Sequence, residues 1–267
     1  MLMPNVGQQT VAAPRQSYLI WFSQRVGSSM LTQALEDTGI AGRPREWLED
    51  PAGHGLPAKY GVRDAVQLRD FLWREAATPN GVMGSKYGID ADGHLELTAL
   101  FAGIIPGVVD PDGSKAWEAV FPACKHVFMT RRNKLRPAVS WLRAIRSQEW
   151  HRPNRADTVF GEAPPRTSAA DVIHHYDYDD LDFLLMGINR QEAEMQDQFD
   201  RWGVVPYTVV YEDLVADYDP TVRQLLDFLE IPGHADITIP RPALDRLADE
   251  ASEDWYQRFR RGRAARS

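Results

Sequence analysis

The chain has 267 residues, of which 43% are hydrophobic, and its formal net charge is -8 at pH 7. This length and apolar content are enough for one sizeable core, so we expect residues 1–267 to form a single domain. A chain with this acidic balance does not bind nucleic acid through its overall charge, so any anion site must be local. Cys124 is the one cysteine, which excludes an intrachain disulfide and a cysteine-based metal site and favours a reducing compartment.

The sequence also argues against insertion into a membrane. The start, MLMPNVGQQTVAAPRQ, lacks a charged beginning followed by a continuous apolar stretch. No segment approaches the roughly 18 uninterrupted apolar residues that span a bilayer. We therefore expect a soluble, cytoplasmic protein in which residues 1–15 are poorly ordered.

Short apolar runs alternate along the chain with longer segments of helical period. This pattern predicts an α/β, P-loop-like fold with a central parallel sheet flanked by helices. In chain order we predict a strand at 17–23, helices after Gly27 and at 64–74, a strand at 81–88, a helix at 95–105, a strand at 125–130, a helix after Asn133, a helix at 181–202, a strand at 206–214 and a helix after Asp219. Residues 151–171 are rich in proline and small polar residues and are predicted to form a long surface loop.

The segment YLIWFSQRVGSSML, residues 18–31, leads from the first predicted strand into the first predicted helix. The N–H groups of a first helical turn attract phosphate. Arg25 adds a permanent charge, Gly27 allows a close backbone approach, and Ser28 or Ser29 can cap the helix. The lysine and first glycine of GxxxxGK[ST] are missing, which weakens the case for an ATPase. These residues alone support an anion-binding turn and an ordinary capped turn equally well.

A second cationic turn follows the strand predicted at 125–130. Between residues 125 and 155, lysine and arginine outnumber acidic residues nine to one within an acidic protein. Arg131 and Arg132 come directly after this strand, and Ser140 lies on the helix that follows. Ligands of open α/β sheets bind beyond the carboxyl ends of the strands, so the two turns together predict one ligand with two anionic ends. A solvated basic face is the alternative interpretation.

These motifs resemble those of sulfotransferases that use 3′-phosphoadenosine 5′-phosphosulfate (PAPS), most closely the bacterial branch typified by trehalose 2-sulfotransferase. FSQRVGSSML resembles the 5′-phosphosulfate loop of that branch, with Val26 where serine is usual. FMTRRNKLRPAVSWLRA resembles the 3′-phosphate segment, and TGIAGRPREWL the segment that contains the catalytic glutamate. NGVMGSKYG resembles the glycine-lysine strand, while VVYEDLVADYDPTVRQLLDFLEI and SEDWYQRFRRG resemble two later segments. The matches occur in the family's order and cover most of the chain.

The resemblance implies transfer of a sulfuryl group from PAPS, without a metal, to a hydroxyl of a small molecule, a sugar or glycosylated metabolite. Glu46 is the implied general base, and Arg25 and Lys86 are the implied catalytic cations. The implied nucleotide-binding residues are Gln24, Arg25, Gly27, Ser28, Ser29, Arg131, Ser140, Arg258 and Arg260, with Arg132 as an alternative to Arg131. The two C-terminal arginines are equally compatible with a solvated helix end. A homodimer is also implied, and no nucleic-acid partner is expected.

Other residues compete with Glu46 for the role of base. Glu49 and Asp50 lie close to it in the sequence, and either could serve. His54 lies in a glycine-rich loop and ranks after Glu46, because a lone loop histidine is usually exposed. Trp47 is next to the implied base, and its aromatic face would suit a sugar acceptor.

Two other classes of function stay open on sequence grounds. A nucleotide kinase or NTPase could hold Mg²⁺ through Glu212 or Asp213 at the end of the strand predicted at 206–214. A non-catalytic nucleotide-binding protein would keep the cationic turns and need no base. No other metal site is predicted, because the adjacent His174 and His175 lack a third ligand nearby.

Overall fold

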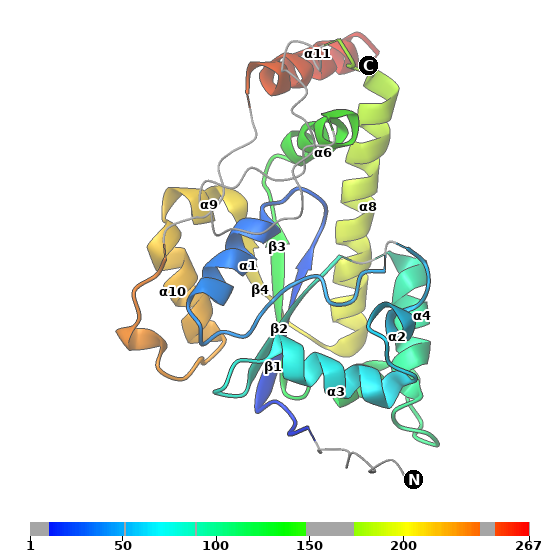
Figure 1. Cartoon of the computed structure of the whole chain (residues 1–267). Helices are drawn as coiled ribbons and strands as arrows, with labels where there is room; N and C mark the ends of the chain where they lie inside the picture. The colour runs from blue at the N-terminus through cyan, green and yellow to red at the C-terminus, as the bar shows by residue number, and fades with distance from the viewer. Residues whose placement is uncertain (1–10, 51, 89, 148–173, 241–248, 267) are drawn as a thin grey trace, which may run out of the picture.

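The computed structural model describes residues 11–266 with gaps at 51, 89, 148–173 and 241–248 (Figure 1). Within these residues, parallel strands form one sheet in the order β2-β1-β3-β4. The strands are β1 Gln16–Phe22, β2 Val82–Tyr87, β3 Cys124–Thr130 and β4 Tyr207–Val210. Because they run the same way, their carboxyl ends meet along one edge, the carboxyl edge. The predicted α/β fold with a central parallel sheet is confirmed.

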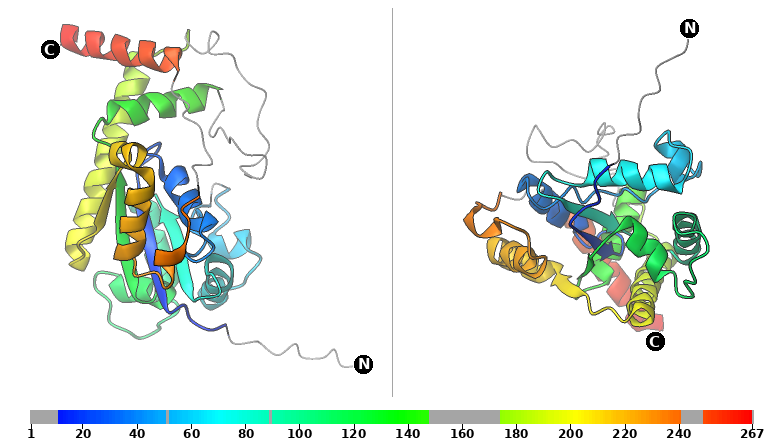
Figure 2. Two further views of the ribbon diagram at one scale, coloured as in Figure 1. Left: turned by 90° about the vertical axis from the view of Figure 1, so that its left-hand side faces the viewer. Right: turned by 90° about the horizontal axis from the view of Figure 1, so that it is seen from below.

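Helices cover both faces of this sheet. They are α1 Ser28–Asp37, α2 Leu56–Lys59, α3 Ala65–Ala76, α4 Ala91–Ala102, α5 Ser114–Val120, α6 Leu135–Ser147, α8 Tyr178–Trp202, α9 Tyr211–Ala216, α10 Tyr218–Phe228, the 3-10 helix η1 His234–Asp236 and α11 Glu250–Arg266. Helices α1, α9 and α10 pack on one face, and α3, α4, α5 and α8 pack on the other. Helices α6 and α11 lie beyond the carboxyl edge, against the start of α8 (Figures 1 and 2).

The side chains of β1 alternate between two hydrophobic clusters. Tyr18, Ile20 and Phe22 join the cluster on the α1 face, whereas Leu19 and Trp21 join the cluster on the α3 face. Successive side chains of a strand point to opposite faces, so a strand that is covered on both sides must be apolar throughout. This explains why β1 is an unbroken apolar run from Tyr18 to Phe22.

The fourth strand is shorter than predicted. Residues 206–214 were expected to be one strand, but β4 ends at Val210 and α9 begins at Tyr211. Glu212 and Asp213 lie in the first turn of α9, where the helix dipole favours negative charge. A short apolar run does not distinguish a strand from the start of a helix, which is why the prediction was wrong here.

The predicted helices after Gly27 and Asn133 and those around 64–74, 95–105 and 181–202 are present, with bounds shifted by a few residues. The loop predicted at 151–171 lies outside the described residues, as do residues 1–10. The single domain and the poorly ordered residues 1–15 stay predictions. Among the described helices, none is both long enough and apolar enough to cross a membrane.

Candidate active site

Residues 23–29, called here the anion turn, connect β1 to α1 at the carboxyl edge. Arg25 and Gly27 both have left-handed backbone conformations, with φ values of 65° and 97°. Helix α1 begins at Ser28 with Gly27 as its N-cap and without a capping bond from a side chain. The prediction that Ser28 or Ser29 caps this helix is therefore wrong. Met30 and Leu31 donate their N–H groups to the carbonyl of Gly27, so it is the N–H groups of Ser28 and Ser29, ahead of them, that have no acceptor within the helix and can bind an anion.

Val26 explains one departure of this turn from the family pattern. Its side chain is fully buried in the cluster that packs between the sheet and α1. A serine at this position would place a hydroxyl in an apolar environment, which costs free energy unless it finds a hydrogen-bond partner. Val26 is therefore a core residue in this chain and anchors the anion turn to the fold.

Tyr211, the first residue of α9, contacts both cationic turns. A Cβ atom on Gly27 would lie 2.4 Å from Cδ2 of Tyr211, so the ring packs directly against the glycine. The guanidinium carbon of Arg131 lies 3.5 Å from the centre of the same ring, a cation-π contact. The structure thus brings Gly27 and Arg131 to one aromatic ring. The sequence analysis missed Tyr211, although its place after a strand that ends at the carboxyl edge could have indicated it.

Helix α6 contributes a second link between the turns. Nε of Arg25 donates a hydrogen bond to Oγ of Ser140 over 3.2 Å. Ser140 belongs to the helix that follows β3, so this bond joins the anion turn to the segment after the second cationic turn. Gln24, also expected to bind the nucleotide, is half-buried in the anion turn.

Arg131 and Arg132 have different surroundings. The guanidinium of Arg132 forms an ion pair with Asp213 at 2.6 Å, and its backbone N–H donates to Oε2 of Glu212 at 3.0 Å. These two acids therefore bind Arg132, whereas the kinase interpretation would have assigned them to a magnesium ion. Arg131, stacked on Tyr211, is the better candidate for binding an anion together with Ser140.

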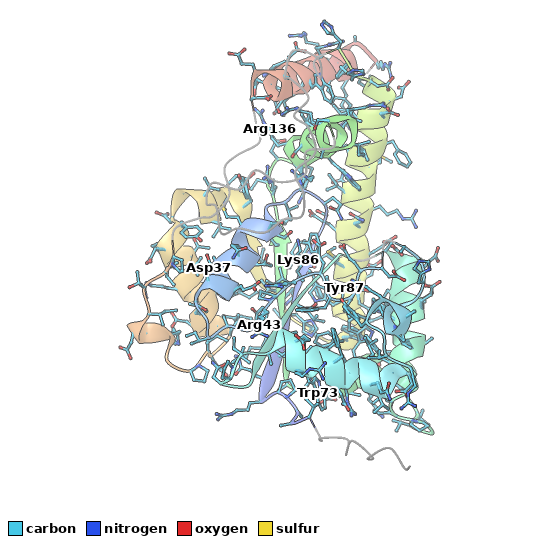
Figure 3. The ribbon with its side chains drawn as sticks, in the orientation of Figure 1. Asp37, Arg43, Trp73, Lys86, Tyr87 and Arg136 are labelled. Carbon is cyan, nitrogen blue, oxygen red and sulfur yellow. The ribbon has the colours of Figure 1, made fainter. Side chains whose placement is uncertain are left out.

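Lys86 lies beside α1 in the centre of the molecule (Figure 3). It is near the end of β2 and points to the α1 face, where its ammonium lies 4.9 Å from the centre of the Phe22 ring. Its exposed fraction is only 8%. Nζ of Lys86 donates to Oγ of Ser29 over 3.4 Å and forms an ion pair with Glu46. A single buried cation therefore contacts both the start of α1 and a carboxylate.

Residues 42–49, called here the carboxylate segment, bring Glu46 to Lys86 by pairing with β2. The backbone N–H of Lys86 donates to the carbonyl of Arg45 over 3.0 Å. The approach is close at Gly42, where a Cβ atom would lie 2.6 Å from the backbone nitrogen of Gly84. The position of Glu46 therefore depends on a long-range pairing with a strand about 40 residues away in the chain.

The arginines beside Glu46 in the sequence bind elsewhere. Nη1 of Arg43 donates to the carbonyl of Glu75 at 2.8 Å, and Arg45 forms an ion pair with Glu36. The charged group that contacts this carboxylate is instead Lys86, through the ion pair. Burial, followed by the neighbouring Glu46, raises the pKa of Glu49 to about 8.

The other candidates for the base have different surroundings. Asp50 accepts a hydrogen bond from the backbone N–H of Gly55 at 2.5 Å and so closes a turn. His54 is exposed on that loop. The indole of Trp47 donates to the carbonyl of Arg43 at 2.7 Å and packs with the hydrophobic cluster on the α3 face. Of these candidates, Glu46 is therefore the carboxyl group that the structure pairs with Lys86.

Glu192 is a functional candidate that the sequence analysis missed. This residue of α8 accepts hydrogen bonds from Ser23 at 3.0 Å and from Thr130 at 2.9 Å, at the ends of β1 and β3. It also forms an ion pair with Lys134, and its side chain is only 12% exposed. Glu192 thus connects the two central strand ends at the carboxyl edge. No local pattern marks it, because its partners are about 60 or more residues away in the chain.

The C-terminal arginines lie on α11. Arg258 lies over the ring of Tyr176 at 4.1 Å and pairs with Asp254 at 3.5 Å. Arg260 lines a pocket of about 560 Å³ together with Lys134. Since Lys134 also contacts Glu192, this pocket adjoins the carboxyl edge. The expected roles of Arg258 and Arg260 in nucleotide binding stay predictions.

Two ion pairs, one largely buried and one exposed, join α6 to the start of α11 and the residue before it. Arg143, only 8% exposed, pairs with Asp249 at 2.9 Å. Arg136, labelled on α6 in Figure 3, pairs with Glu253 at 2.6 Å. Ion pairs with these acidic side chains therefore neutralise part of the excess positive charge around α6. His174 and His175 are exposed, and within the described residues no three His, Cys, Asp or Glu side chains gather to hold a metal ion.

The fold and the carboxyl edge define the class of protein. A helix start open to anions, cationic turns and a buried lysine beside a carboxylate suit an enzyme that transfers a group from an anionic donor. The family model of the Stf0 sulphotransferases matches residues 17–262, and the chain belongs to this family. The protein is therefore a sulfotransferase, which confirms the class that its motifs resemble.

Two characterised relatives align over almost the whole chain. Trehalose 2-sulfotransferase of Mycolicibacterium smegmatis is 26% identical over 275 residues, covering 92% of this chain and 94% of that protein. Trehalose 2-sulfotransferase of Mycobacterium tuberculosis is 27% identical over 273 residues, covering 91% and 94%. A crystal structure of a sulfotransferase from Alicyclobacillus acidocaldarius aligns over 94% of this chain and 93% of that chain, with 17% identity and a TM-score of 0.44.

Proposed function

We propose that this enzyme transfers a sulfuryl group from PAPS to a hydroxyl of a sugar or glycosylated metabolite, with Glu46 as the general base. The contacts of Lys86 carry the proposal. This buried cation binds Ser29 at the anion turn and pairs with Glu46 in the carboxylate segment. A donor bound at the start of α1 and an acceptor beside Glu46 would therefore meet at one positive charge.

The residues at the carboxyl edge fit a ligand with two anionic ends. Arg25, Gly27 and Ser29 would hold the 5′-phosphosulfate with the first N–H groups of α1. Arg131 and Ser140 would hold the 3′-phosphate, because Arg131 stacks on Tyr211 beside Gly27 and Ser140 binds Arg25 of the anion turn. The hydrogen bond between Arg25 and Ser140 supports one continuous site for both ends.

The proposed chemistry needs positioning and charge stabilisation. PAPS supplies an activated sulfuryl group on an adenosine 3′,5′-bisphosphate leaving group. Glu46 takes the proton of the acceptor hydroxyl as that oxygen bonds to sulfur and the bond from sulfur to the bridging oxygen breaks. Lys86, Arg25 and the N-terminus of α1 stabilise the negative charge that develops on the bridging oxygen. The products are a sulfate ester, the bisphosphate and a proton on Glu46.

The acceptor is proposed from the relatives and from the surroundings of Glu46. The aligned relatives are named as trehalose sulfotransferases. Trp47, next to Glu46, is partly buried and could contribute an aromatic surface to a sugar. We propose a sugar hydroxyl on these grounds and place the reaction in the cytoplasm, which suits the reduced state of a lone cysteine. The homodimer stays a prediction.

The first test is a calorimetric titration with adenosine 3′,5′-bisphosphate, beside AMP, ADP and Mg-ATP at the same salt concentration. Selective binding of the bisphosphate is expected, because two separated cationic turns require two separated phosphates. Incubation with PAPS and trehalose, followed by mass spectrometry, then tests transfer. Preferential binding of Mg-ATP would overturn the proposed donor and favour the kinase interpretation.

A further inference from the structure

Glu192 occupies a position on the buried side of α8. Ile188, Met195 and Phe199, at helical spacing from it, are all fully buried. A carboxylate at such a position costs free energy unless charged and hydrogen-bonding partners replace the lost water. An apolar side chain would satisfy the packing at least as well, since replacement of a buried ion pair by hydrophobic residues is often neutral or stabilising. The acid is therefore better explained by the contacts that it makes.

The two oxygens of the Glu192 carboxylate are divided between two strand ends. Oε1 accepts a hydrogen bond from the hydroxyl of Ser23 over 3.0 Å, and Oε2 accepts one from the hydroxyl of Thr130 over 2.9 Å. The ammonium of Lys134 donates to Oε2 and to the hydroxyl oxygen of Thr130, and it neutralises the carboxylate. One largely buried carboxylate thus joins β1 and β3 through a separate hydrogen bond to each.

These bonds connect the two strands where their backbone pairing stops. β1 and β3 pair in parallel as far as Phe22 and Met129, and the two hydroxyl residues come next in each strand. Beyond that point each strand leads into its own cationic turn. Arg25 follows two residues after the first hydroxyl residue, and Arg131 follows directly after the second. The carboxylate of Glu192 therefore fixes the distance between the turns at their base.

The other links between the turns involve side chains that are proposed to hold the nucleotide. Arg25 donates to Ser140, and Arg131 stacks on Tyr211. The partners of Glu192 are strand-end hydroxyls that have no part in the proposed phosphate contacts. The hydrogen bonds of Glu192 therefore set the same spacing before and after the nucleotide binds.

We propose that Glu192 is a positioning residue that fixes the separation of the two cationic turns and so makes the site selective for a nucleotide with phosphates at both its 5′ and its 3′ end. This inference rests on the proposed use of PAPS as the donor. A ligand with two charged ends gains from its second contact only if the two sites match the spacing of those ends. A ligand with one phosphate does not sense this spacing. Glu192 itself touches no ligand in this account.

The decisive variants are Glu192→Ala, which removes both hydrogen bonds, and Glu192→Gln, whose amide can accept from one hydroxyl and donate to the other. By calorimetric titration we expect Glu192→Ala to weaken binding of adenosine 3′,5′-bisphosphate about 5- to 20-fold, and binding of AMP and adenosine 3′-phosphate by less than about twofold. Glu192→Gln should stay within about threefold of wild type for all three nucleotides. Glu194→Ala, which removes an ion pair with Arg190 on the same helix, is the matched control and should bind as wild type does.

The sign of the effect separates spacing from electrostatics. Loss of the Glu192 charge leaves Lys134 without its carboxylate, so a purely electrostatic role predicts tighter binding of every phosphate ligand by Glu192→Ala. Loss of the spacing weakens binding of the two-phosphate ligand alone. Equal or tighter binding of the bisphosphate by Glu192→Ala would therefore overturn the proposal. An equal loss for all three nucleotides would also overturn it, because that loss indicates a general disturbance of the fold.

Ser23→Ala and Thr130→Val remove the same hydrogen bonds from the strand side, and they test the proposal even if Glu192→Ala does not fold. Each should lower the preference for the bisphosphate over AMP. Ser23→Ala should add little to the effect of Glu192→Ala, because both remove the same bond. An unchanged preference in both strand variants would contradict the proposal.

The same titrations separate this inference from the proposed function. If wild type binds the bisphosphate no better than AMP, the proposed donor fails, and the role of Glu192 fails with it. If wild type prefers the bisphosphate and Glu192→Ala keeps that preference, only the role of Glu192 fails and the donor stands. Preference in wild type and its loss in Glu192→Ala, with rescue by Glu192→Gln, supports both.

Discussion

The anion turn and the carboxylate segment supply the two halves of the proposed active site, but the fold builds them in different ways. The anion turn lies between β1 and α1, so consecutive residues supply its glycine, its charge and its helix start. The carboxylate segment gains its position by pairing with β2 and its charge balance from Lys86. A site can therefore combine one half that is encoded locally with another that exists only in the folded chain.

The largest expected effect comes from the carboxylate segment. Glu46→Gln should lower kcat by roughly 10²- to 10⁴-fold, because an amide cannot accept the proton of the acceptor hydroxyl. Affinity for adenosine 3′,5′-bisphosphate should stay nearly constant, since the anion turn is unchanged. Steady-state kinetics and calorimetry on the same preparation check both. Retained turnover would remove Glu46 from the chemistry.

The next largest effect concerns the shape of the anion turn. Gly27→Ala should destabilise the protein by about 2–4 kcal/mol, because the residue is left-handed and its new Cβ would push Tyr211 away. Bisphosphate binding should weaken as well. Gly39→Ala is a matched control, because its φ is also positive, at 70°, and no atom lies within 4 Å of its Cβ. Equal unfolding free energies for the two variants would show that the contact with Tyr211 is not tight.

The second cationic turn should show a smaller and more selective effect. Arg131→Ala should weaken bisphosphate binding by about 1.5–3 kcal/mol through loss of a charge-assisted hydrogen bond. Arg132→Ala should weaken bisphosphate binding by less than about 1 kcal/mol, because Arg132 binds Asp213 in an exposed ion pair instead of the phosphate in this account. Calorimetric titration of both variants gives the comparison. The opposite ranking would move the 3′-phosphate from Arg131 to Arg132.

The smallest of these effects is expected for Glu192, and it concerns the stability of the fold. Glu192→Ala leaves the hydroxyls of Ser23 and Thr130 without their carboxylate and should destabilise the protein by about 1–2 kcal/mol. Glu194→Ala on the same helix removes only a surface ion pair with Arg190 and should cost less than about 0.5 kcal/mol. Denaturant unfolding of the two variants measures the difference. Equal values would mean that Glu192 does not brace the two strand ends.

The sequence predicted the parts of the site that depend on local order. Apolar runs identified the strands, and the turns after β1 and β3 pointed to Arg25, Gly27 and Arg131. The implied pair of Glu46 and Lys86 came from family resemblance, because their contact requires the pairing of residues 42–49 with β2. Their contact in the structure agrees with that resemblance.

Other features could not be predicted because several distant segments create them together. Tyr211 was placed inside a strand, since a run of apolar residues does not show where a strand ends and a helix begins. Glu192 on α8 gave no local signal for its contacts with β1 and β3. The raised pKa of Glu49 depends on burial and on the nearby Glu46, against the opposite effect of Lys86, so no spacing along the chain could have shown it.

The most direct test of the central claim is a double-mutant cycle on Lys86 and Glu46, with kcat for sulfuryl transfer from PAPS as the readout. If one buried lysine links donor and base, the effects of Lys86→Met and Glu46→Gln on kcat should not be additive. The increase in activation free energy of the double variant should then be at least about 1 kcal/mol smaller than the sum of the two single increases. Fully additive losses would show that the two residues act independently, which would contradict the account.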